Sequence, residues 1–558
     1  MTGFQFDVVV VGGGHAGIEA ALAAARMGAK AALVTHDTRE IGRMPCNPAI
    51  GGLGKGHLVR EIDVLGGDMG VAIDLSGIQF RVLNQKKGPA VQSPRAQADK
   101  HLYQRTMMER VLAQDGLEVI EADAAGVLHS AQDIVNERLE VLGVMLGDGR
   151  QIRSRRVILC SGTFLKGLMH VGEAQTVGGR EGAASSEGLS SSLTDLGFTL
   201  RRLKTGTPPR LWRDSIDFSR LTPQTGDRIP QPFSFRTRDF APDQVDCHMA
   251  YTNAGTHEII SKSLDRSPLF GGVISGQGPR YCPSIEDKVV RFADKDRHLL
   301  FLEPEARNDP EIYVNGLSTS LPADVQEKVV RSVPGLEQAR IARFGYAIEY
   351  DSIPSWQINR NLESKPVAGL YLAGQILGTS GYEEAAAQGL VAGVNAVLGL
   401  DGKAPLDIGR DEGYTGVLVD DLVTKEINEP YRMFTSRAEH RLYLRCDNAE
   451  DRLGPLALKL GLLSGQDQAV LKARAELVER LSALLKKSSV FYKEKGRRLM
   501  AGDYLRFPGA TLATMKTDIQ AGDEFWDEFN FAEKKLLNKT DNPRILKDAL
   551  SQVENDFR

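Results

Sequence analysis

The sequence predicts an α/β protein with a Rossmann-like dinucleotide-binding fold, an inserted α+β domain and a C-terminal α-helical region. Three observations support this fold class. Residues 7–17 (DVVVVGGGHAG) join four valines to a glycine-rich turn. Residues 369–381 (GLYLAGQILGTSG) again join an apolar run to a glycine-rich loop. Residues 470–485 (VLKARAELVERLSALL) have the apolar spacing of a helix.

The first turn has the pattern Gly12-x-Gly14-x-x-Gly17, which indicates a buried strand, a tight turn and the start of a helix over residues 18–27. We expect Gly12 to permit the turn, Gly14 to let the backbone approach a pyrophosphate, and Gly17 to let the helix pack on the strand. The helix N-terminus would then face the phosphates. A glycine-rich turn without a ligand is the alternative.

The second strand is predicted over residues 31–35, and its end lacks the usual ribose-binding carboxylate. Thr35 and His36 stand there, with Asp37 just beyond. A hydroxyl or an imidazole can also hydrogen-bond a diol, so the ribose contact stays unassigned.

Two later segments are predicted to belong to the same dinucleotide-binding fold. Residues 157–160 form an apolar run before Ser161-Gly162-Thr163, and residues 369–375 predict another buried strand. The loop 378–381 leads into a predicted helix over residues 382–398, whose small residues permit close packing.

These segments divide the chain into three predicted domains. Residues 1–197 and 347–402 form a discontinuous cofactor domain, residues 198–346 an inserted domain, and residues 403–558 the helical region. Within the insertion, residues 271–282 (GGVISGQGPRYC) form a glycine-rich loop suited to a second phosphate-bearing ligand or a substrate. A structural turn is the alternative there.

In the C-terminal region, Ser436-Arg437-Ala438-Glu439 has the pattern of a capping box. The helix that it predicts would align Arg437, Arg441 and Arg445 on one face, able to follow phosphates. A solvated charged face is the alternative.

Composition narrows the function classes. The 558 residues carry a formal net charge of -4, so a nucleic-acid partner must be met by a local basic patch. The chain enters its first strand within a few residues and has no apolar run approaching ~20 residues, so we expect a cytoplasmic protein. Five scattered cysteines without a CxxC pair argue against a disulfide framework, a metal site or a dithiol redox centre.

Two cysteines are candidate catalytic residues. Cys46 lies in a glycine-rich loop (MPCNPAIGGLGKG) between Arg43 and Lys55, and a cation near a thiol favours the thiolate. A thiolate can attack an electron-poor carbon and later be expelled. Cys282 follows Arg280 in a comparable loop. A buried, inert thiol is the alternative for each.

The chain resembles the glucose-inhibited division protein A family (GidA, MnmG), the flavoprotein subunit of the enzyme that modifies the tRNA wobble uridine with a carboxymethylaminomethyl group. The resemblance covers roughly residues 5–455. It rests on the blocks GGGHAGIEAALAAARMG, CNPAIGGLGKGHLVREID, GIQFRVLNQKKGPAV, RLKTGTPPR, GPRYCPSIEDKVVRFAD, GYAIEYD, AGQILGTSGYEEAAAQGL and EPYRMFTSRAEHRL.

The resemblance implies a Rossmann-like FAD-binding fold, oxidation of NADH bound by the inserted domain, and a methylene-tetrahydrofolate carbon donor. Glycine or ammonium supplies the nitrogen in that family. The implied flavin contacts are Gly12, Gly13, Gly14, His15, Ala16, Gly17, Ala124 and Gln375. The implied NADH segment is Gly278, Pro279, Arg280, Tyr281, Pro283, Ser284, Ile285, Glu286, Asp287, Lys288, Val289, Val290, Arg291 and Phe292. The two important cysteines of the family correspond to Cys46 and Cys282.

The resemblance also implies partners: tRNA, a second copy of the chain, and an MnmE-type GTPase. The family's longer helical tail, which docks the GTPase, is not recognisable in residues 525–558, so this docking is uncertain. The candidate RNA contacts, chosen by charge, are Arg201, Arg202, Lys204, Arg210, Arg437, Arg441 and Arg445.

Two other functions remain open. One is a folate- and FAD-dependent tRNA uracil-5 methyltransferase, which shares the fold but is usually shorter. The other is a non-catalytic flavoprotein that binds tRNA or a partner.

Overall fold

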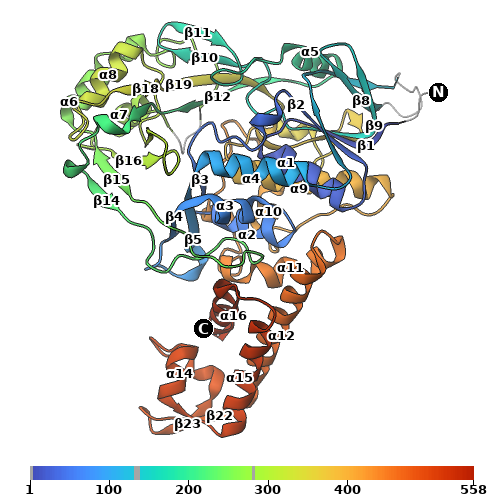
Figure 1. The fold of residues 1–558 in the computed structure, drawn as a ribbon, viewed down its shortest axis with the longest axis vertical. Coiled ribbons are helices and arrows are strands. Elements are labelled where there is room, and N and C mark those ends of the chain that lie inside the picture. Colours follow the sequence, from blue (N-terminus) through green and yellow to red (C-terminus); the bar gives the residue numbers. More distant parts are fainter. Residues whose placement is uncertain (1–3, 131–137, 279–282, 558) are drawn as a thin grey trace.

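The computed structural model describes residues 4–130, 138–278 and 283–557, and Figure 1 shows their arrangement. The largest sheet has strand order β20-β8-β9-β1-β2-β6, with β21 paired to β9 and β7 to β8. Its strands are β1 (Phe6–Val11), β2 (Ala31–Thr35), β6 (Leu117–Glu121), β7 (Ala124–His129), β8 (Leu139–Leu146), β9 (Gln151–Leu159), β20 (Val367–Ala368) and β21 (Leu370–Leu372). β1 lies between β2 and β9 and is parallel to both. The predicted parallel α/β core is confirmed.

Two helices pack together over this sheet: α1 (His15–Arg26) and α9 (Tyr382–Leu400). They approach closely because α9 carries glycines at the contact. A Cβ atom added to Gly389 would lie 1.9 Å from the carbonyl oxygen of Ala16, and one added to Gly393 would lie 2.4 Å from that of Ala20. The prediction that small residues permit close packing of this helix is confirmed.

A second layer carries the loop of Cys46. It contains a three-stranded antiparallel sheet and three helices that follow the loop in the chain. The strands are β3 (Ala49–Gly51), β4 (Gly77–Leu83) and β5 (Ser93–Ala98), and the helices are α2 (Lys55–Val64), α3 (Met69–Ser76) and α4 (Lys100–Leu112).

A four-stranded antiparallel sheet leads into and out of the inserted region. Its strands are β10 (Leu168–Val171), β11 (Ala174–Val177), β12 (Arg201–Thr207) and β19 (Tyr346–Ser352), with helix α5 (Glu187–Asp195) between β11 and β12 in the chain. β12 and β19 pair along their whole length, from Arg201 opposite Ser352 to Thr207 opposite Tyr346.

The inserted region lies beside the main sheet, at the upper left of Figure 1. Its six-stranded sheet has the order β14-β15-β16-β17-β13-β18. The strands are β13 (Arg210–Trp212), β14 (Thr222–Gln224), β15 (Cys247–Tyr251), β16 (Leu299–Pro304), β17 (Glu311–Asn315) and β18 (Ile341–Arg343), and the helices are α6 (Ala254–Ser261), α7 (Ile285–Arg291) and α8 (Ala323–Arg331). These elements enclose a hydrophobic core of their own.

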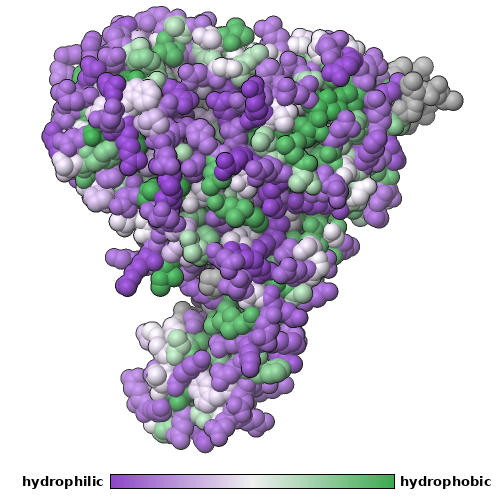
Figure 2. Space-filling view, in the orientation of Figure 1, coloured by the Kyte–Doolittle hydropathy of each residue, from purple (hydrophilic) through white to green (hydrophobic). Residues whose placement is uncertain are grey.

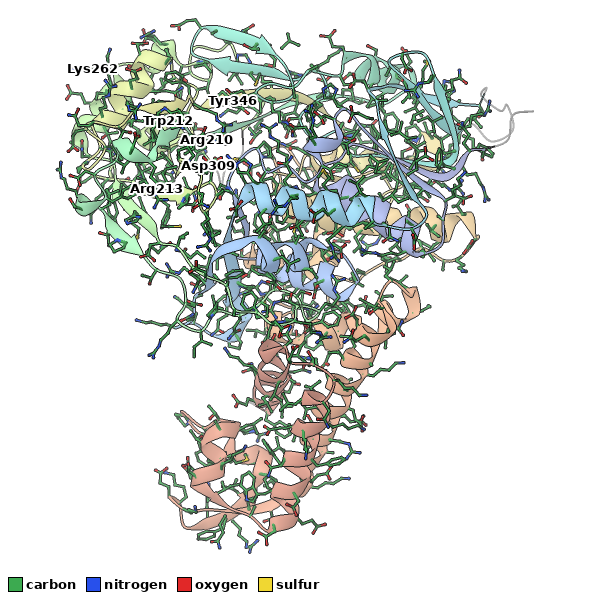
Figure 3. All side chains as sticks on the ribbon, in the orientation of Figure 1. Arg210, Trp212, Arg213, Lys262, Asp309 and Tyr346 are labelled. Atoms are coloured by element: carbon green, nitrogen blue, oxygen red, sulfur yellow. The ribbon has the colours of Figure 1, made fainter. Side chains whose placement is uncertain are left out.

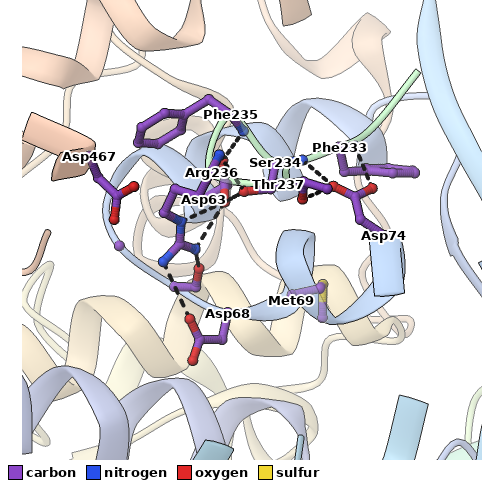
Figure 4. A network of polar contacts seen from close by, with 12 residues as sticks. Asp63, Asp68, Met69, Asp74, Phe233, Ser234, Phe235, Arg236, Thr237 and Asp467 are labelled. Atoms are coloured by element: carbon purple, nitrogen blue, oxygen red, sulfur yellow. Dashed lines mark hydrogen bonds and ion pairs between the residues drawn. The ribbon is translucent and has the colours of Figure 1, made fainter. Parts of the chain in front are cut away.

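Residues 233–237 leave the inserted region and attach to α2 and α3, as Figure 4 shows. Asp74 accepts hydrogen bonds from the backbone N–H groups of Phe233 (2.6 Å) and Ser234 (2.8 Å). Arg236 forms an ion pair with Asp63 at 2.9 Å, and the rings of Phe233 and Phe235 enter the main core. The insertion is therefore anchored to the layer that carries Cys46. The predicted domain boundaries themselves stay predictions.

The helices of the C-terminal region are α10 (Tyr414–Thr424), α11 (Ala449–Leu460), α12 (Gly465–Lys487), α13 (Ala501–Tyr504), α14 (Leu512–Asp518), α15 (Asp523–Leu537) and α16 (Pro543–Phe557). The part of the chain after α11 forms a narrower lobe at the bottom of Figures 1 and 2, whereas α10 lies in the main body beside α2. The predicted helix over residues 470–485 is confirmed within α12. A small sheet of β22 (Ser489–Tyr492), β23 (Arg497–Met500) and β24 (Ile519–Gln520) was not predicted.

The helix predicted to start at Ser436 is wrong. Residues 435–437 form a single 3₁₀ turn, and Ala438 has an extended backbone with φ -93° and ψ 116°. The preceding segment is fixed by tertiary bonds: Tyr431 donates its N–H to the carbonyl of Gly378 and accepts from the N–H of Ser380, both at 2.8 Å. These contacts outweigh the local capping pattern, so the three arginines do not share a helix face. None of the described helices is long and apolar enough to cross a bilayer.

Candidate active site

The turn between β1 and α1 has the features of a dinucleotide cradle. Gly12 has φ +110°, and a Cβ atom on Gly17 would lie 1.8 Å from the carbonyl oxygen of Gly12. Gly14, by contrast, has no atom within 4 Å of the position of an added Cβ. No side chain caps α1, and its first turn holds no acidic residue. An anionic pyrophosphate fits this end of the helix.

His15 opens α1 and is enclosed by tyrosine rings. Its ring centroid lies 4.4 Å from that of Tyr382 and 5.7 Å from that of Tyr103. Burial lowers the pKa of His15 to about 3, so its imidazole is neutral at physiological pH. The positive potential at the N-terminus of α1 therefore comes from backbone N–H groups and not from the imidazole of His15.

The end of β2 does not supply a ribose carboxylate. His36 lies 2.7 Å from Asp123, and Asp37 caps the next turn and pairs with Arg39 at 2.7 Å. Thr35 is buried beside Gly13. Ala124 begins β7 and is buried, and Gln375 lies half-buried in a 3₁₀ turn, Gly374–Leu377, directly after β21. The ribose contact remains unassigned.

Cys46 lies where three parts of the fold meet. Its backbone N–H donates to the hydroxyl of Tyr382 at the start of α9, at 2.9 Å. Its Sγ lies 3.2 Å from the hydroxyl of Tyr313 on β17 and 3.9 Å from the carbonyl oxygen of Gly206 on β12. The thiol is half-buried. The cofactor fold and the inserted region thus both contact it.

The cations near Cys46 differ from those expected. Lys55 is buried and pairs with Glu383 and Glu384, each at 2.9 Å, while Arg43 pairs with Glu40 at 2.5 Å. Arg210 instead reaches the loop, because its Nη2 donates to the carbonyl oxygen of Pro45 at 2.8 Å. Its guanidinium also lies 4.9 Å from the ring centroid of Tyr313. Arg43 and Lys55 thus each pair with carboxylates, and Arg210 is the cation that contacts the residue before Cys46.

The glycine loop is held by the first turn of α9. Glu383 accepts the backbone N–H of Gly51 at 2.7 Å as well as the ammonium group of Lys55. A Cβ atom on Gly54 would lie 2.9 Å from the backbone of Phe434, so the segment after α10 covers this loop. These contacts fix the chain on the C-terminal side of Cys46.

The predicted NADH segment is only partly described: Pro279, Arg280, Tyr281 and Cys282 lie outside the described residues. Before them, Gln277 accepts the backbone N–H of Lys204 at 3.1 Å, next to Gly278. After them, Ser284 caps α7. Ile285, Glu286 and Val289 are buried, whereas Val290, Arg291 and Phe292 are exposed. The NADH assignment of this segment stays a prediction.

A cavity of about 260 Å³ opens beside the Cys46 loop. Met44 and Pro45, which precede the cysteine, form part of its wall, and Lys100, Arg180, Arg210, Arg343 and Tyr346 form much of the rest. Figure 3 places Arg210, Asp309 and Tyr346 on the side of the inserted region that faces α1. Burial lowers the pKa of Lys100 to about 8, against the opposing effect of Asp309.

The candidate RNA contacts occupy different environments. Lys204, Arg210 and Arg445 are buried, and Arg445 pairs with Asp447 at 2.8 Å. Arg201 and Arg202 are half-buried, with Arg202 3.1 Å from Asp351. Arg437 lies 4.1 Å from the ring centroid of Tyr431. Arg441 is exposed in a turn, followed by Leu442 and Tyr443, which are 78% and 56% exposed.

Sequence reasoning missed two tyrosines that contact Cys46 and three cations of the adjoining cavity. Tyr313, Tyr382, Lys100, Arg180 and Arg343 come from five separate elements or loops, and no local motif marks them. Burial raises the pKa of Cys247 to about 12 and also raises that of Cys160 and of Cys446, which disfavours their thiolate forms.

Comparisons of this chain with a family model, with curated proteins and with solved structures agree on one family. A family model described as "Glucose inhibited division protein A" matches residues 7–404. The chain is 52% identical over 513 residues to the tRNA uridine 5-carboxymethylaminomethyl modification enzyme MnmG of Rhodopirellula baltica, covering 91% of this chain and 78% of the relative. It is 55% identical over 474 residues to the protein of the same name from Geobacter sulfurreducens, covering 85% and 74%.

The solved structure of Aquifex aeolicus GidA superposes with a TM-score of 0.86 at 46% identity, and the match covers 98% of this chain and 89% of that one. The match therefore includes the C-terminal lobe as well as the sheet core. The chain belongs to the glucose-inhibited division protein A family.

Proposed function

We propose that this protein is an FAD- and NADH-dependent tRNA-modifying enzyme that builds a carboxymethylaminomethyl or aminomethyl group at carbon 5 of the wobble uridine. The carbon would come from methylene-tetrahydrofolate. The observation that carries the proposal is the position of Cys46, whose thiol is contacted by both the dinucleotide fold and the inserted region. The relatives that carry the corresponding enzyme name support it.

The chemistry requires a nucleophile at this point. Carbon 5 of uracil is a poor nucleophile until a group adds at carbon 6, and addition of the Cys46 thiolate there would generate an enolate. The Tyr313 hydroxyl, 3.2 Å from Sγ, would orient the sulfur, and Tyr382 would fix the backbone of Cys46. When bound, reduced FAD would supply the hydride.

The cofactor assignments rest on two parts of the fold. The uncapped N-terminus of α1 and the open position beside Gly14 fit the pyrophosphate of FAD. NADH would be bound by the inserted region, by the segment that runs from Gly278 to Phe292 at the end of α7. A GTPase partner and a second copy of this chain belong to the same proposal and are supported by family membership.

The test uses cells that lack the family enzyme. They would be complemented with the wild type, Cys46→Ser, or Cys247→Ala as a matched control in a buried strand, and their tRNA nucleosides analysed by mass spectrometry. We expect the wild type and the control to restore the modified wobble uridine and Cys46→Ser to fail. A wild type that yields 5-methyluridine would instead indicate a uracil methyltransferase. A soluble, yellow wild type without either product would indicate a non-catalytic flavoprotein.

A further inference from the structure

The cavity beside the Cys46 loop has an uneven distribution of charge. Its wall contains five basic side chains, Arg43, Lys100, Arg180, Arg210 and Arg343, and two acidic ones, Glu181 and Glu305. Most of the cations are balanced by carboxylates. Lys100 and Arg210 share Glu305, Lys100 also lies 3.6 Å from Asp309, and Arg343 pairs with Glu311 at 2.6 Å.

The two remaining arginines of the wall, Arg43 and Arg180, are paired differently. Arg43 and Arg180 both pair with a single carboxylate, that of Glu40. The two guanidinium groups therefore share one carboxylate, and Glu181 in the same wall forms no ion pair with either of them. A guanidinium group that is largely buried and only partly paired favours an anion beside it.

Arg180 is the more buried of these two arginines. Its guanidinium lies 5.3 Å from the ring centroid of Phe164, and its side chain is only 15% exposed. One terminal nitrogen contacts Glu40, while Nε is buried and makes no hydrogen bond to any described residue. Burial lowers the pKa of Arg180 more than Glu40 raises it, which agrees with incomplete compensation. The guanidinium group is thus held in place, and its Nε donates to no described residue.

The acidic groups of the same cavity limit which anion fits. Glu181 and Glu305 would repel a phosphate dianion. Glu305 already pairs with Lys100 and Arg210, so Glu181 is the carboxylate that can accept hydrogen bonds from an ammonium or amine group of a ligand. A ligand with one carboxylate and one amine matches both sides. At about 260 Å³ the cavity is also at the small end for ligand pockets.

The product named for the relatives contains such a ligand. A carboxymethylaminomethyl group carries a carboxylate separated from its nitrogen by one carbon, as in an α-amino acid without a side chain. Met44 and Pro45 in the cavity wall lie directly before Cys46, so a molecule held here would be close to the base attacked by that thiol.

We propose that this cavity binds the amino-acid nitrogen donor, with Arg180 bound to its carboxylate and Arg43 supporting that contact. The inference rests on the proposed function, which it deepens by assigning a site to one substrate. Arg180 is a specificity-determining residue in this arrangement: a donor that lacks a carboxylate, such as ammonium, gains nothing from it.

The test lets two donors compete in one reaction. The FAD-loaded protein with its GTPase partner, tRNA, NADH and methylene-tetrahydrofolate would receive glycine and ammonium together, and mass spectrometry would quantify the two products. For Arg180→Gln we expect the ratio of carboxymethylaminomethyl to aminomethyl uridine to fall about tenfold or more relative to the wild type. The matched control is Arg266→Gln, which removes an exposed arginine paired with Asp324. An unchanged ratio in Arg180→Gln would overturn the assignment.

Two further measurements distinguish recognition of a carboxylate by Arg180 from other roles of this residue. Wild-type protein should use glycinamide, which lacks the carboxylate, about tenfold less well than glycine, and this comparison needs no variant. Equal use would overturn the proposal. Loss of flavin absorbance or of tRNA affinity in Arg180→Gln, with the product ratio unchanged, would assign the guanidinium to a phosphate and also overturn it.

The inference can fail separately from the proposed function. If the wild type forms neither product, the proposed function fails, and binding of glycine alone can still be measured by saturation-transfer NMR. Glycine binding to the wild type that is lost in Arg180→Gln supports the site. Absence of glycine binding to the wild type contradicts it.

Discussion

Gly14 and Gly17 stand three residues apart in one turn, but they have opposite surroundings. The position of a Cβ atom on Gly17 is filled by the backbone of Gly12, whereas the corresponding position on Gly14 is open. Gly17 is therefore required by the packing of the protein itself. Gly14 has an ordinary backbone, with φ -80°, and is required only if a ligand occupies the space beside it.

The first prediction uses this difference. Gly14→Val should fold normally because no protein atom is near the new side chain, but it should lose FAD because the side chain would occupy the pyrophosphate position. Flavin absorbance and thermal unfolding would be measured together. Gly88→Val is the matched control, since Gly88 also has open space and φ -64°. Full flavin occupancy in Gly14→Val would remove the pyrophosphate assignment.

The second prediction concerns the Tyr313 hydroxyl. Tyr313→Phe removes the group that lies 3.2 Å from the sulfur of Cys46 and leaves the ring beneath Arg210. A hydrogen bond of about 1 kcal/mol corresponds to a roughly fivefold lower kcat, and we expect little change in KM for tRNA. Tyr251→Phe is the control, because Tyr251 also carries an arginine over its ring but lies on β15. A wild-type kcat in Tyr313→Phe would contradict the orienting role.

At the scale of elements, α2 shows how buried charges position the active-site loop. All ten residues of α2 are buried, including Lys55, Arg60, Glu61 and Asp63. Their partners lie on other elements: Glu61 accepts the N–H groups of Tyr414 and Thr415 at the start of α10, at 2.9 and 2.8 Å. Acidic side chains at a helix N-terminus are favourable. α2 therefore joins the Cys46 loop to the segments that cover it.

The third prediction concerns the anchor of residues 233–237 on α3. Burial raises the pKa of Asp74 from 3.8 to about 7, although Thr237 and two backbone N–H groups donate to it and lower it. Because the folded pKa exceeds the unfolded one, the stabilisation from protonated Asp74 is fully present below pH ~4 and is lost as the pH rises through about 7. Asp74→Asn cannot titrate, so the unfolding free energy of the wild type minus that of the variant should fall from pH 6 to pH 8.

Chemical denaturation at pH 6, 7 and 8 would measure this difference in unfolding free energy. Asp214→Asn serves as a control, since Asp214 is exposed and pairs with Arg340 on the surface. A stability difference that is constant, or that grows with pH, would contradict the raised pKa of Asp74.

At the scale of the whole molecule, the C-terminal helix returns to the layer of the active site. Asp548 on α16 pairs with Arg60 on α2 at 2.6 Å and with Arg544 at 3.1 Å. Arg544 and Arg474 are fully buried, and Glu450 on α11 pairs with Arg544 at 2.6 Å. The lobe that projects in Figure 1 is thus joined to α2 through buried ion pairs.

The fourth prediction concerns Asp548, the carboxylate that pairs with both Arg60 and Arg544. Asp548→Ala leaves Arg60 and Arg544 without that carboxylate, and breaking a buried pair typically destabilises by about 3 kcal/mol or more. We expect a lower unfolding free energy and faster hydrogen exchange in α16. Glu258→Ala, which breaks an exposed pair with Lys262, should change stability by less than about 0.5 kcal/mol. Equal effects of the two variants would show that the junction is not a structural anchor.

The fifth prediction concerns tRNA. Arg441 is exposed beside Tyr443, and the segment that carries it follows the residues that cover both glycine loops. Arg441→Glu should weaken tRNA binding and reduce the salt dependence of the affinity by about one phosphate contact. Lys262→Glu on α6 is the matched charge reversal at another exposed site. An unchanged salt slope for Arg441→Glu would exclude this contact.

The sequence alone determined the parts of the protein that depend on neighbouring residues. Four valines before Gly12 specify a buried strand and a turn, because strand periodicity and positive φ are local properties. The same holds for the strand before Gly374, for α9 and for α12. The loop of Cys46 was likewise identified from its composition.

Tertiary structure decided everything that depends on residues distant in the chain. The capping pattern at Ser436 was overridden because hydrogen bonds from Tyr431 to the loop after Gly378 hold the segment extended. The cations beside Cys46 in the sequence pair elsewhere. From the inserted region, Tyr313 contacts the sulfur of Cys46, and Arg210 donates to the carbonyl of the preceding Pro45. Local propensities amount to a few tenths of a kcal/mol per residue, whereas a buried charge without a partner costs several, so the buried pairs determine which side chains surround the thiol.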